Sequence, residues 1–194
     1  TRFASLFDVV NKTSTTIGKR ALVSLLSKPF KHSKDIEKRY RMNEIMDNNY
    51  SKEMVNILES ICDFERLHRR MSLGLLHPYQ FNTLVKTYHS IRDLIDYFKL
   101  LEMDIHPIER LSELIDSIEQ EFQLDIMKGI TLTENLDMPQ LFKRGVVKEL
   151  DIINDKVIEI RDKVETIKMR YTTIIGGNEE WIKVMYSEND GYYL

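Results

Sequence analysis

The sequence of 194 residues holds a single cysteine, Cys62, and only seven glycines and four prolines. One cysteine cannot form an internal disulfide, and such sparse use of cysteine is typical of the reducing interior of a cell. So few glycines and prolines leave little room for an all-β fold with many tight turns. No run approaches the roughly 18 apolar residues of a membrane-spanning helix, and no signal peptide is recognisable at the start. We therefore expect an intracellular protein that is neither secreted nor inserted in a membrane.

Charge of neither sign dominates, because 28 Lys and Arg stand against 31 Asp and Glu. Hydrophobic residues make up 42% of the chain, which is enough to bury a core, and the length fits one domain with at most a small appendage. The first 70 residues carry a small basic excess. This excess is more typical of a solvated surface than of a dedicated nucleic-acid-binding arm.

Apolar residues recur at helical spacing along almost the whole chain, which predicts a mainly α fold with a multi-helical core. N-terminal caps are expected from the Thr/Ser cluster before residue 17 and from Ser33, because their side-chain oxygens can accept free helical N–H groups. Ser51 is expected to start the next helix. The inward positions expected from this spacing include Tyr40 and Met71, then Leu84, Tyr88, Ile91 and Ile95 in the helix over 78–103, and Ile108, Leu111, Ile115, Ile118 and Ile126 in the helix over 107–126. The predicted helices cover residues 6–10, 17–27, 34–48, 51–71, 78–103 and 107–126, followed by an irregular connection over 129–146.

The most regular segment runs from about Val147 to Ile174. Its apolar residues step by alternating threes and fours, a strict seven-residue repeat that keeps one face against a partner helix. At about 1.5 Å per residue, such a helix would be on the order of 40 Å long, and Gly176-Gly177 would end it. The face of the repeat, called the seam below, consists of Leu150, Ile153, Val157, Ile160, Val164, Ile167, Tyr171 and Ile174.

After these glycines the apolar period changes to the alternation of a β-strand. A partial hairpin is predicted, with Asn189-Asp190-Gly191 in its turn. Because an isolated hairpin this short is marginal in water and the long seam lacks a neighbour of its own length, we expect a fragment of a larger protein. The predicted parts are a helical core domain over 1–146, a long lever helix over 147–178 and the start of a β-element over 179–194.

The residues by themselves predict no catalytic, metal-binding or cofactor-binding site. The Gly18-Lys19 pair lacks the G-x-x-x-x-G-K-[ST] loop that wraps a phosphate. Glu65 and His68 have the E-x-x-H spacing of carboxylate-bridged metal bundles, but such a site needs a second pair and two further Glu. Cys62 lies at core spacing and is expected to be a small buried hydrophobe.

Four motifs follow one another along the chain, and together they resemble the central region of the DNA mismatch-repair ATPase family MutS. Each motif alone is weak, but their order and spacing cover nearly the whole sequence. They are Leu6-Phe7-Asp8-Val9-Val10 with Gly18-Lys19-Arg20 and Pro29; Asp63-Phe64-Glu65-Arg66-Leu67 with Arg70; Gly145 with Glu149-Leu150-Asp151; and Gly191-Tyr192-Tyr193-Leu194.

The resemblance implies the core and lever domain of a MutS-like protein, with the first hairpin of its clamp domain at the end of the lever. In that family the lever helix runs antiparallel to a second helix that returns from the clamp, and the seam would face that helix. The implied function is mechanical: the fragment would couple a DNA-gripping clamp to a distant ATPase domain. The fragment itself would not be an enzyme and would hold no cofactor, whereas ATP and Mg²⁺ would bind to a P-loop domain of the full-length parent.

The implied partners are double-stranded DNA, held non-specifically and mainly through phosphates, the remainder of the parent chain, and a second parent subunit. Lys168 and Lys183 are the candidate DNA contacts in this sequence. The alternative is a self-contained helical adaptor or coiled-coil oligomerisation module, in which the seam pairs with itself or with another protein. The residues assigned to the structural motif of the family are Gly18, Arg20, Pro29, Asp63, Glu65, Arg66, Arg70, Gly145, Glu149, Asp151, Gly191 and Tyr192.

Overall fold

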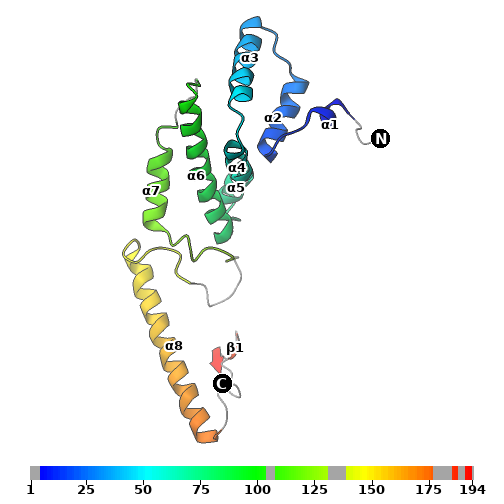
Figure 1. The fold of residues 1–194 in the computed structure, drawn as a ribbon. Helices are drawn as coiled ribbons and strands as arrows, with labels where there is room; N and C mark the ends of the chain where they lie inside the picture. Colours follow the sequence, from blue (N-terminus) through cyan, green and yellow to red (C-terminus); the bar gives the residue numbers. More distant parts are fainter. Residues whose placement is uncertain (1–4, 104–107, 131–138, 177–184, 188–190, 194) are drawn as a thin grey trace. The chain divides into compact units, whose positions relative to one another are not determined.

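The computed structural model describes residues 5–103, 108–130, 139–176, 185–187 and 191–193. These residues form a mainly α fold, as predicted, in which the strands make only a short hairpin (Figure 1). The chain divides into two compact units, residues 1–141 and 142–194. The elements are α1 (Leu6–Val10), α2 (Thr16–Ser27), α3 (Ser33–Asn48), α4 (Lys52–Ser60), α5 (Phe64–Ser72), α6 (Pro78–Leu100), α7 (Leu111–Glu121), α8 (Lys148–Ile175), β1 (Met185–Ser187) and β2 (Gly191–Tyr193).

Short polar side chains fix the start of several helices. The hydroxyl of Thr15 accepts a hydrogen bond from the first turn of α2, and Ser51 does the same for α4. These caps satisfy backbone donors that have no partner inside the helix. The predicted cap at Ser33 is wrong: α3 begins at Ser33, and His32 precedes it without a side-chain cap. The helix predicted to start at Ser51 begins at Lys52, with Ser51 as its cap.

The single helix predicted over 51–71 is wrong, because the chain breaks between α4 and α5. Ile61 has an extended backbone, with φ −80° and ψ 109°, and Asp63 caps the new helix by accepting from the N–H of Arg66. The backbone N–H of Cys62 donates to the hydroxyl of Thr87 on α6 at 3.3 Å. The break thus replaces helical hydrogen bonds with a cap and a tertiary contact, and it lets two short helices pack on α6.

Two other predicted helices are too long at their ends. The one predicted over 78–103 stops at Leu100, where Glu102 turns into the left-handed region with φ 53°. The one predicted to reach residue 126 ends at Glu121, because Phe122 is extended and the N–H of Gln123 donates to the carbonyl of Leu141 at 2.8 Å. After α6 the N–H groups of residues 101–103 turn back to the carbonyls of Phe98 and Lys99, whereas after α7 the N–H of Gln123 finds its partner outside the helix.

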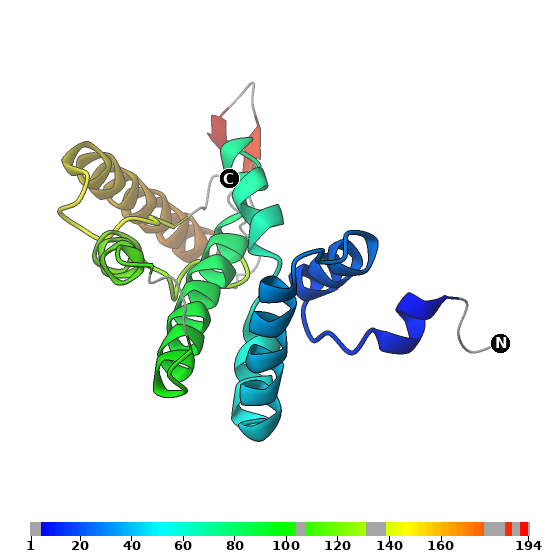
Figure 2. The same ribbon diagram turned by 90° about the horizontal axis from the view of Figure 1, so that it is seen from above.

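The hydrophobic core of the first unit lies around α6, which has α4 and α5 on one side and α7 on the other (Figures 1 and 2). Its centre consists of Leu84 and Tyr88 from α6 with Leu111 and Ile115 from α7. The 3.6-residue period predicted this inward face correctly along α6 and α7. The partly buried residues packed against the centre are Phe64, Leu67, Ile91, Ile95 and Ile118.

The helical period misplaces several residues. Met71, Ile108 and Ile126 lie at or beyond helix ends, whereas Tyr40 lies midway along α3, a helix with no buried residue. Tyr40 is 68% exposed and Ile108 54%, although both were expected to face inward, and Met71 and Ile126 are also exposed. Met127 is buried instead, in the turn that follows α7, where the chain is no longer helical.

The second unit consists of the long helix α8 and the β1–β2 hairpin. The 28 residues of α8 correspond to a length of about 42 Å at 1.5 Å per residue. Gly176 ends α8 in the left-handed conformation with φ 66°, as predicted from the glycine pair. In the hairpin, β1 and β2 are antiparallel, with Ser187 opposite Gly191. The hairpin is therefore confirmed, while Asn189 and Asp190 of its predicted turn lie outside the described part of the chain.

Candidate functional site

The first two family motifs meet in an ion-pair cluster between α2 and α5. The guanidinium of Arg20 donates to both carboxylate oxygens of Asp63, at 2.8 and 2.9 Å, and also to the carboxylate of Glu65. These residues are 43 and 45 positions apart in the sequence. Because the planar guanidinium matches a carboxylate in two parallel hydrogen bonds, the cluster fixes the orientation of α2 against the start of α5.

Asp63 has two roles in this cluster, because it also caps α5. Its Oδ1 accepts the backbone N–H of Arg66 at 3.3 Å while the same carboxylate binds Arg20. The hydrogen bond from Arg20 holds the pKa of the Asp63 carboxyl below its ordinary value of 3.8. The same carboxylates raise the pKa of Arg20, so the pair stays charged at neutral pH. The motif residues Asp63 and Glu65 therefore act as structural anions.

Arg70 connects the end of α5 to the start of α6. Its Nη2 donates to the carbonyl of Leu75 at 2.7 Å, and its Nε donates to the side-chain oxygen of Gln80 at 3.1 Å. That oxygen of Gln80 also accepts the backbone N–H of His77 at the start of α6. The role of Gln80 was not predicted from the sequence, although Gln80 follows the N-cap residue His77 by three positions, which is the spacing of a capping box.

Gly18 and Pro29 shape the two ends of α2. A Cβ on Gly18 would lie 2.9 Å from the hydroxyl oxygen of Thr15, the atom that caps this helix. Pro29 follows the C-terminal cap Lys28, whose backbone is no longer helical, as expected of a residue before proline. The first motif thus sets the bounds of the helix that carries Arg20.

The third motif builds the entry to α8. Gly145 has a φ of 93°, a conformation that favours glycine, and its N–H donates to the carboxylate of Asp151 at 2.7 Å. Arg144 donates to Asp155 at 2.7 Å, one turn further along the helix. Glu149 lies in the first turn, where a negative side chain stabilises the positive end of the helix dipole. In the fourth motif, Gly191 has a φ of 72° and Tyr192 pairs with Tyr186 across the hairpin.

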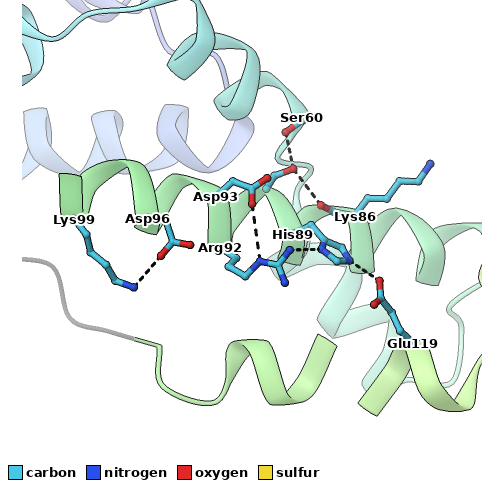
Figure 3. A network of polar contacts seen from close by, with 9 residues as sticks. Ser60, Lys86, His89, Arg92, Asp93, Asp96, Lys99 and Glu119 are labelled. Carbon is cyan, nitrogen blue, oxygen red and sulfur yellow. Dashed lines mark hydrogen bonds and ion pairs between the residues drawn. The ribbon is translucent and has the colours of Figure 1, made fainter. Parts of the chain in front are cut away.

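A second polar network lies on α6 and was missed in the sequence (Figure 3). His89 contacts Glu119 of α7 at 2.8 Å through Nε2, and Arg92 donates to its Nδ1 at 3.0 Å. On the other side of α6, Ser60 of α4 donates to Ser90 at 2.7 Å. This network ties α6 to its neighbours.

Of the two candidate DNA contacts, Lys168 lies on α8 and Lys183 lies outside the described residues. The side chain of Lys168 is 23% exposed and pairs with Glu165 at 2.8 Å. Its assignment to DNA stays a prediction.

The residues considered above as possible metal or nucleotide ligands have structural roles. His68 lies 2.6 Å from the hydroxyl of the core residue Tyr88, and among the described residues no group of three His, Cys, Asp or Glu could hold a metal ion. Gly18 and Lys19 are part of α2, so they form no phosphate-wrapping loop. The hydroxyl of Thr87 donates a hydrogen bond to the sulfur of Cys62, with 2.9 Å between oxygen and sulfur.

No helix in the described ranges combines the length and apolar character needed to cross a bilayer.

Comparison with known proteins decides the family of these motifs. The family model described as MutS domain III matches residues 1–176 of this sequence, which is most of the chain. The chain belongs to the MutS domain III family. Domain III is the core and lever region of MutS and not its ATPase domain, so the resemblance inferred from the four motifs is confirmed, and so is the assignment of the chain to a part without the ATPase.

Relatives of this MutS domain III chain are described as DNA mismatch repair proteins. It is 30% identical to a mutS homologue of Acanthamoeba polyphaga mimivirus, over all of this chain and 18% of that relative. It is 25% identical to MutS of Lactobacillus johnsonii, over all of this chain and 22% of the relative, and 28% identical to MutS of Treponema denticola, over 98% of this chain and 21% of the relative. The chain spans about a fifth of the length of these relatives, so it corresponds to a fragment of a MutS-like mismatch repair protein.

Proposed function

We propose that this chain is a mechanical coupling module, which links the position of a DNA-gripping clamp to the nucleotide state of a distant ATPase domain in a MutS-type parent. The family match carries this proposal. It is supported by α8, a helix of 28 residues that begins at a tightly hydrogen-bonded entry and is followed by a hairpin. A stiff helix of about 42 Å converts a small rotation at its base into a displacement of several ångströms at its tip.

The chemistry of the parent belongs to residues outside this chain. ATP and Mg²⁺ would bind to a P-loop domain, and duplex DNA would be held through phosphate contacts that carry no sequence information. Lys168 and Lys183 are the contacts that this chain would supply. The parent would act as a dimer on intracellular DNA. Within it, the core domain over 1–146 would hold the base of the lever over 147–178, and residues 179–194 would begin the clamp.

The coupling is tested by breaking α8 in the full-length protein that carries these residues. Inserting Gly-Ser-Gly-Ser after Glu159 interrupts the helix midway, because glycine and serine are poor helix formers. We expect stimulation of ATP hydrolysis by DNA to fall at least tenfold, with ATP hydrolysis in the absence of DNA unchanged. The matched control inserts the same four residues after Gln140, in the irregular connection before α8. DNA stimulation equal to that of the control would contradict the coupling role.

The coding sequence of the parent gives a simpler check. We expect a G-x-x-x-x-G-K-[ST] motif downstream of Leu194, because the proposal requires a phosphate-binding loop in the same protein. A complete downstream sequence without it would contradict the proposal.

The alternative function is self-association through the seam, and the exposure of the seam is the observation that favours it. Seven of its eight residues are more than a third exposed in the described chain. If the seam paired with itself, the 194-residue chain would sediment as a dimer, and Ile160→Asn with Val164→Asn would dissociate it. A monomer at micromolar concentration would contradict this alternative.

A further inference from the structure

Ser72 is the last residue of α5, and two arginines stand just before it along the chain. The segment reads Arg69-Arg70-Met71-Ser72-Leu73, with cations three and two positions before the serine and an apolar residue after it. Ser72 is the only serine or threonine of the sequence with basic residues at both of these positions. Basophilic serine kinases select their substrates by such cations, because carboxylates beside the kinase active site pair with them.

The surroundings of Ser72 leave it accessible. Residues 71–75 are all exposed, and Leu73 is 61% exposed. Next to it, Gly74 has a φ of 69°, and within the described chain no atom lies within 4 Å of where its Cβ would stand. The contacts of α5 with the core come from Phe64 and Leu67, near its other end. The end of α5 that carries Ser72 is therefore open to a modifying enzyme.

The last turn of α5 is held mainly by hydrogen bonds. The Oγ of Ser72 donates to the carbonyl of Arg69 at 2.9 Å, and the N–H of Leu73 donates to the same carbonyl at 3.2 Å. A kinase binds its substrate as an extended segment, so this turn has to open first. Because no buried side chain anchors residues 71–75, such a local opening has a low free-energy cost.

The two arginines before Ser72 differ in what they contact. Arg69 is exposed, and no carboxylate of the described chain pairs with its side chain. Arg70 instead donates to the carbonyl of Leu75 and to the side chain of Gln80, which accepts the backbone N–H of His77. Arg69 is therefore the cation that a kinase can recognise in the folded chain, whereas Arg70 joins α5 to the start of α6.

We propose that Ser72 is a phosphorylation site for a basophilic serine kinase, and that the phosphate loosens the joint between α5 and α6. In the reaction, the Oγ of Ser72 attacks the γ-phosphorus of ATP. An Oγ–P bond forms while the bond from this phosphorus to the β–γ bridging oxygen breaks, ADP leaves, and the Oγ proton passes to a base of the kinase. The proposal goes beyond the coupling role and does not depend on it.

The phosphate acts on the joint through its charge. Phosphoserine carries a charge of about −1.5 to −2 at pH 7, and at Ser72 it lies beside the negative end of the α5 dipole. The modified Oγ has no proton left for the carbonyl of Arg69, so that hydrogen bond is lost. A surface ion pair between the phosphate and Arg69 offsets little of this loss. Opening the last turn then disturbs Arg70, whose contacts hold α5 to α6.

The first test incubates the 194-residue chain with ATP, Mg²⁺ and the catalytic subunit of cyclic-AMP-dependent protein kinase, and locates the phosphate by mass spectrometry. We expect a single phosphate, at Ser72, and at least tenfold lower incorporation in Ser72→Ala. A synthetic peptide of residues 66–78 serves as the unfolded reference. Phosphorylation of the peptide without phosphorylation of the chain would show that the fold withholds Ser72, and would overturn the proposal.

Two arginine variants test the recognition. Arg69→Gln should lower the rate of phosphorylation at least tenfold. The matched control is Arg66→Gln, which removes another exposed arginine, one turn earlier on the same helix, and should leave the rate unchanged. Circular dichroism shows that both variants are folded. Equal rates for the two variants would overturn the assignment of Ser72 as a site selected by its arginines.

Hydrogen exchange tests the effect on the joint. In the phosphorylated chain, the amides of residues 70–76 and 79–82 should exchange at least threefold faster than in the unmodified chain, while those of α7 keep their rates. Equal exchange in the two forms would overturn the loosening of the joint. None of these results depends on the ATPase measurement in the full-length protein, so failure of the coupling role and failure of this proposal are distinguishable.

Discussion

Arg20 and Asp63 are joined by two hydrogen bonds, of 2.8 and 2.9 Å, across 43 positions of sequence. This pair is where the first two family motifs meet, and it involves the residue that caps α5. Motif residues that look like candidates for chemistry in the sequence therefore hold helices together in the structure.

Asp63→Ala should lower the free energy of unfolding by about 1 kcal/mol from loss of the helix cap alone. It should also remove most of the effect of Arg20→Ala, because both changes break the same contact. Urea denaturation of the two single variants and the double variant measures this coupling. Additive effects of the two substitutions would show that the pair contributes nothing.

Acid should remove part of the stability that Asp63 provides. Because the folded pKa of its carboxyl lies below 3.8, its stabilising contribution is complete above that value and is lost as the pH falls through the lowered pKa. Asp63→Asn keeps an oxygen for the cap but has no charge to lose. Its urea midpoint should therefore fall less than that of the unmodified chain between about pH 6 and about pH 3.

Ile115→Ala should destabilise the first unit by about 2–5 kcal/mol, because the side chain is fully buried and leaves a cavity. The control is Leu114→Ala, one residue earlier on α7, whose side chain is 46% exposed and whose loss should change stability by only about 0.5 kcal/mol. Thermal or urea unfolding followed by circular dichroism compares the two. Equal losses would contradict the assigned core.

Gly145→Ala should destabilise the entry to α8 by about 1–2 kcal/mol, because alanine is strained at positive φ. Gly145→Asn should cost less, since asparagine tolerates the left-handed region better than alanine. Hydrogen exchange at the first turns of α8 is the readout. If alanine and asparagine behave alike, positive φ is not what this position requires.

Glu102→Gly should stabilise the protein by about 1 kcal/mol, because Glu102 has a φ of 53° at the end of α6 and glycine removes that strain. Lys99→Gly, three residues earlier within the same helix, should instead cost about 1 kcal/mol. Opposite shifts of the urea midpoint would confirm both assignments, and a loss in both variants would contradict the first.

The 194-residue chain should bind duplex DNA weakly and without sequence preference, or not at all. Affinity for duplex DNA comes from cations that contact phosphates and release counterions; only Lys168 and Lys183 are candidate contacts, and Lys168 already pairs with Glu165. Fluorescence anisotropy with two duplexes of different sequence, at several salt concentrations, measures this. Nanomolar, sequence-selective binding at physiological salt would contradict the prediction.

The sequence predicted the helices with strong apolar period well and the joints between them less well. The period along α6 identified Leu84 and Tyr88 as core residues, and the glycine pair after α8 predicted its end. The same period ran through Ile61 to Asp63 without signalling a break, because those residues keep helical spacing while the chain leaves the helix. Periodicity shows only which residues are apolar. A single capping residue such as Asp63 changes that pattern very little, so the break was not predicted.

The candidate site shows the same division between local and tertiary information. The four motifs identified the family before any contact was known, and each residue type at the entry to α8 has a local reason for its place. Nothing near Arg20 in the sequence points to Asp63, and nothing near His89 points to Glu119, because those pairs exist only after α2, α5, α6 and α7 are arranged.

By itself, the sequence determined the helical class, the family and the seven-residue repeat of α8, since these follow from residue type and spacing along one chain. Only the tertiary structure decided that α4 and α5 are separate helices, that Arg20 binds the cap of α5, and that Tyr40 is exposed while Met127 is buried. The physical reason is that helical period depends on neighbours three and four residues away. Burial and ion pairing depend on the residues that folding brings near.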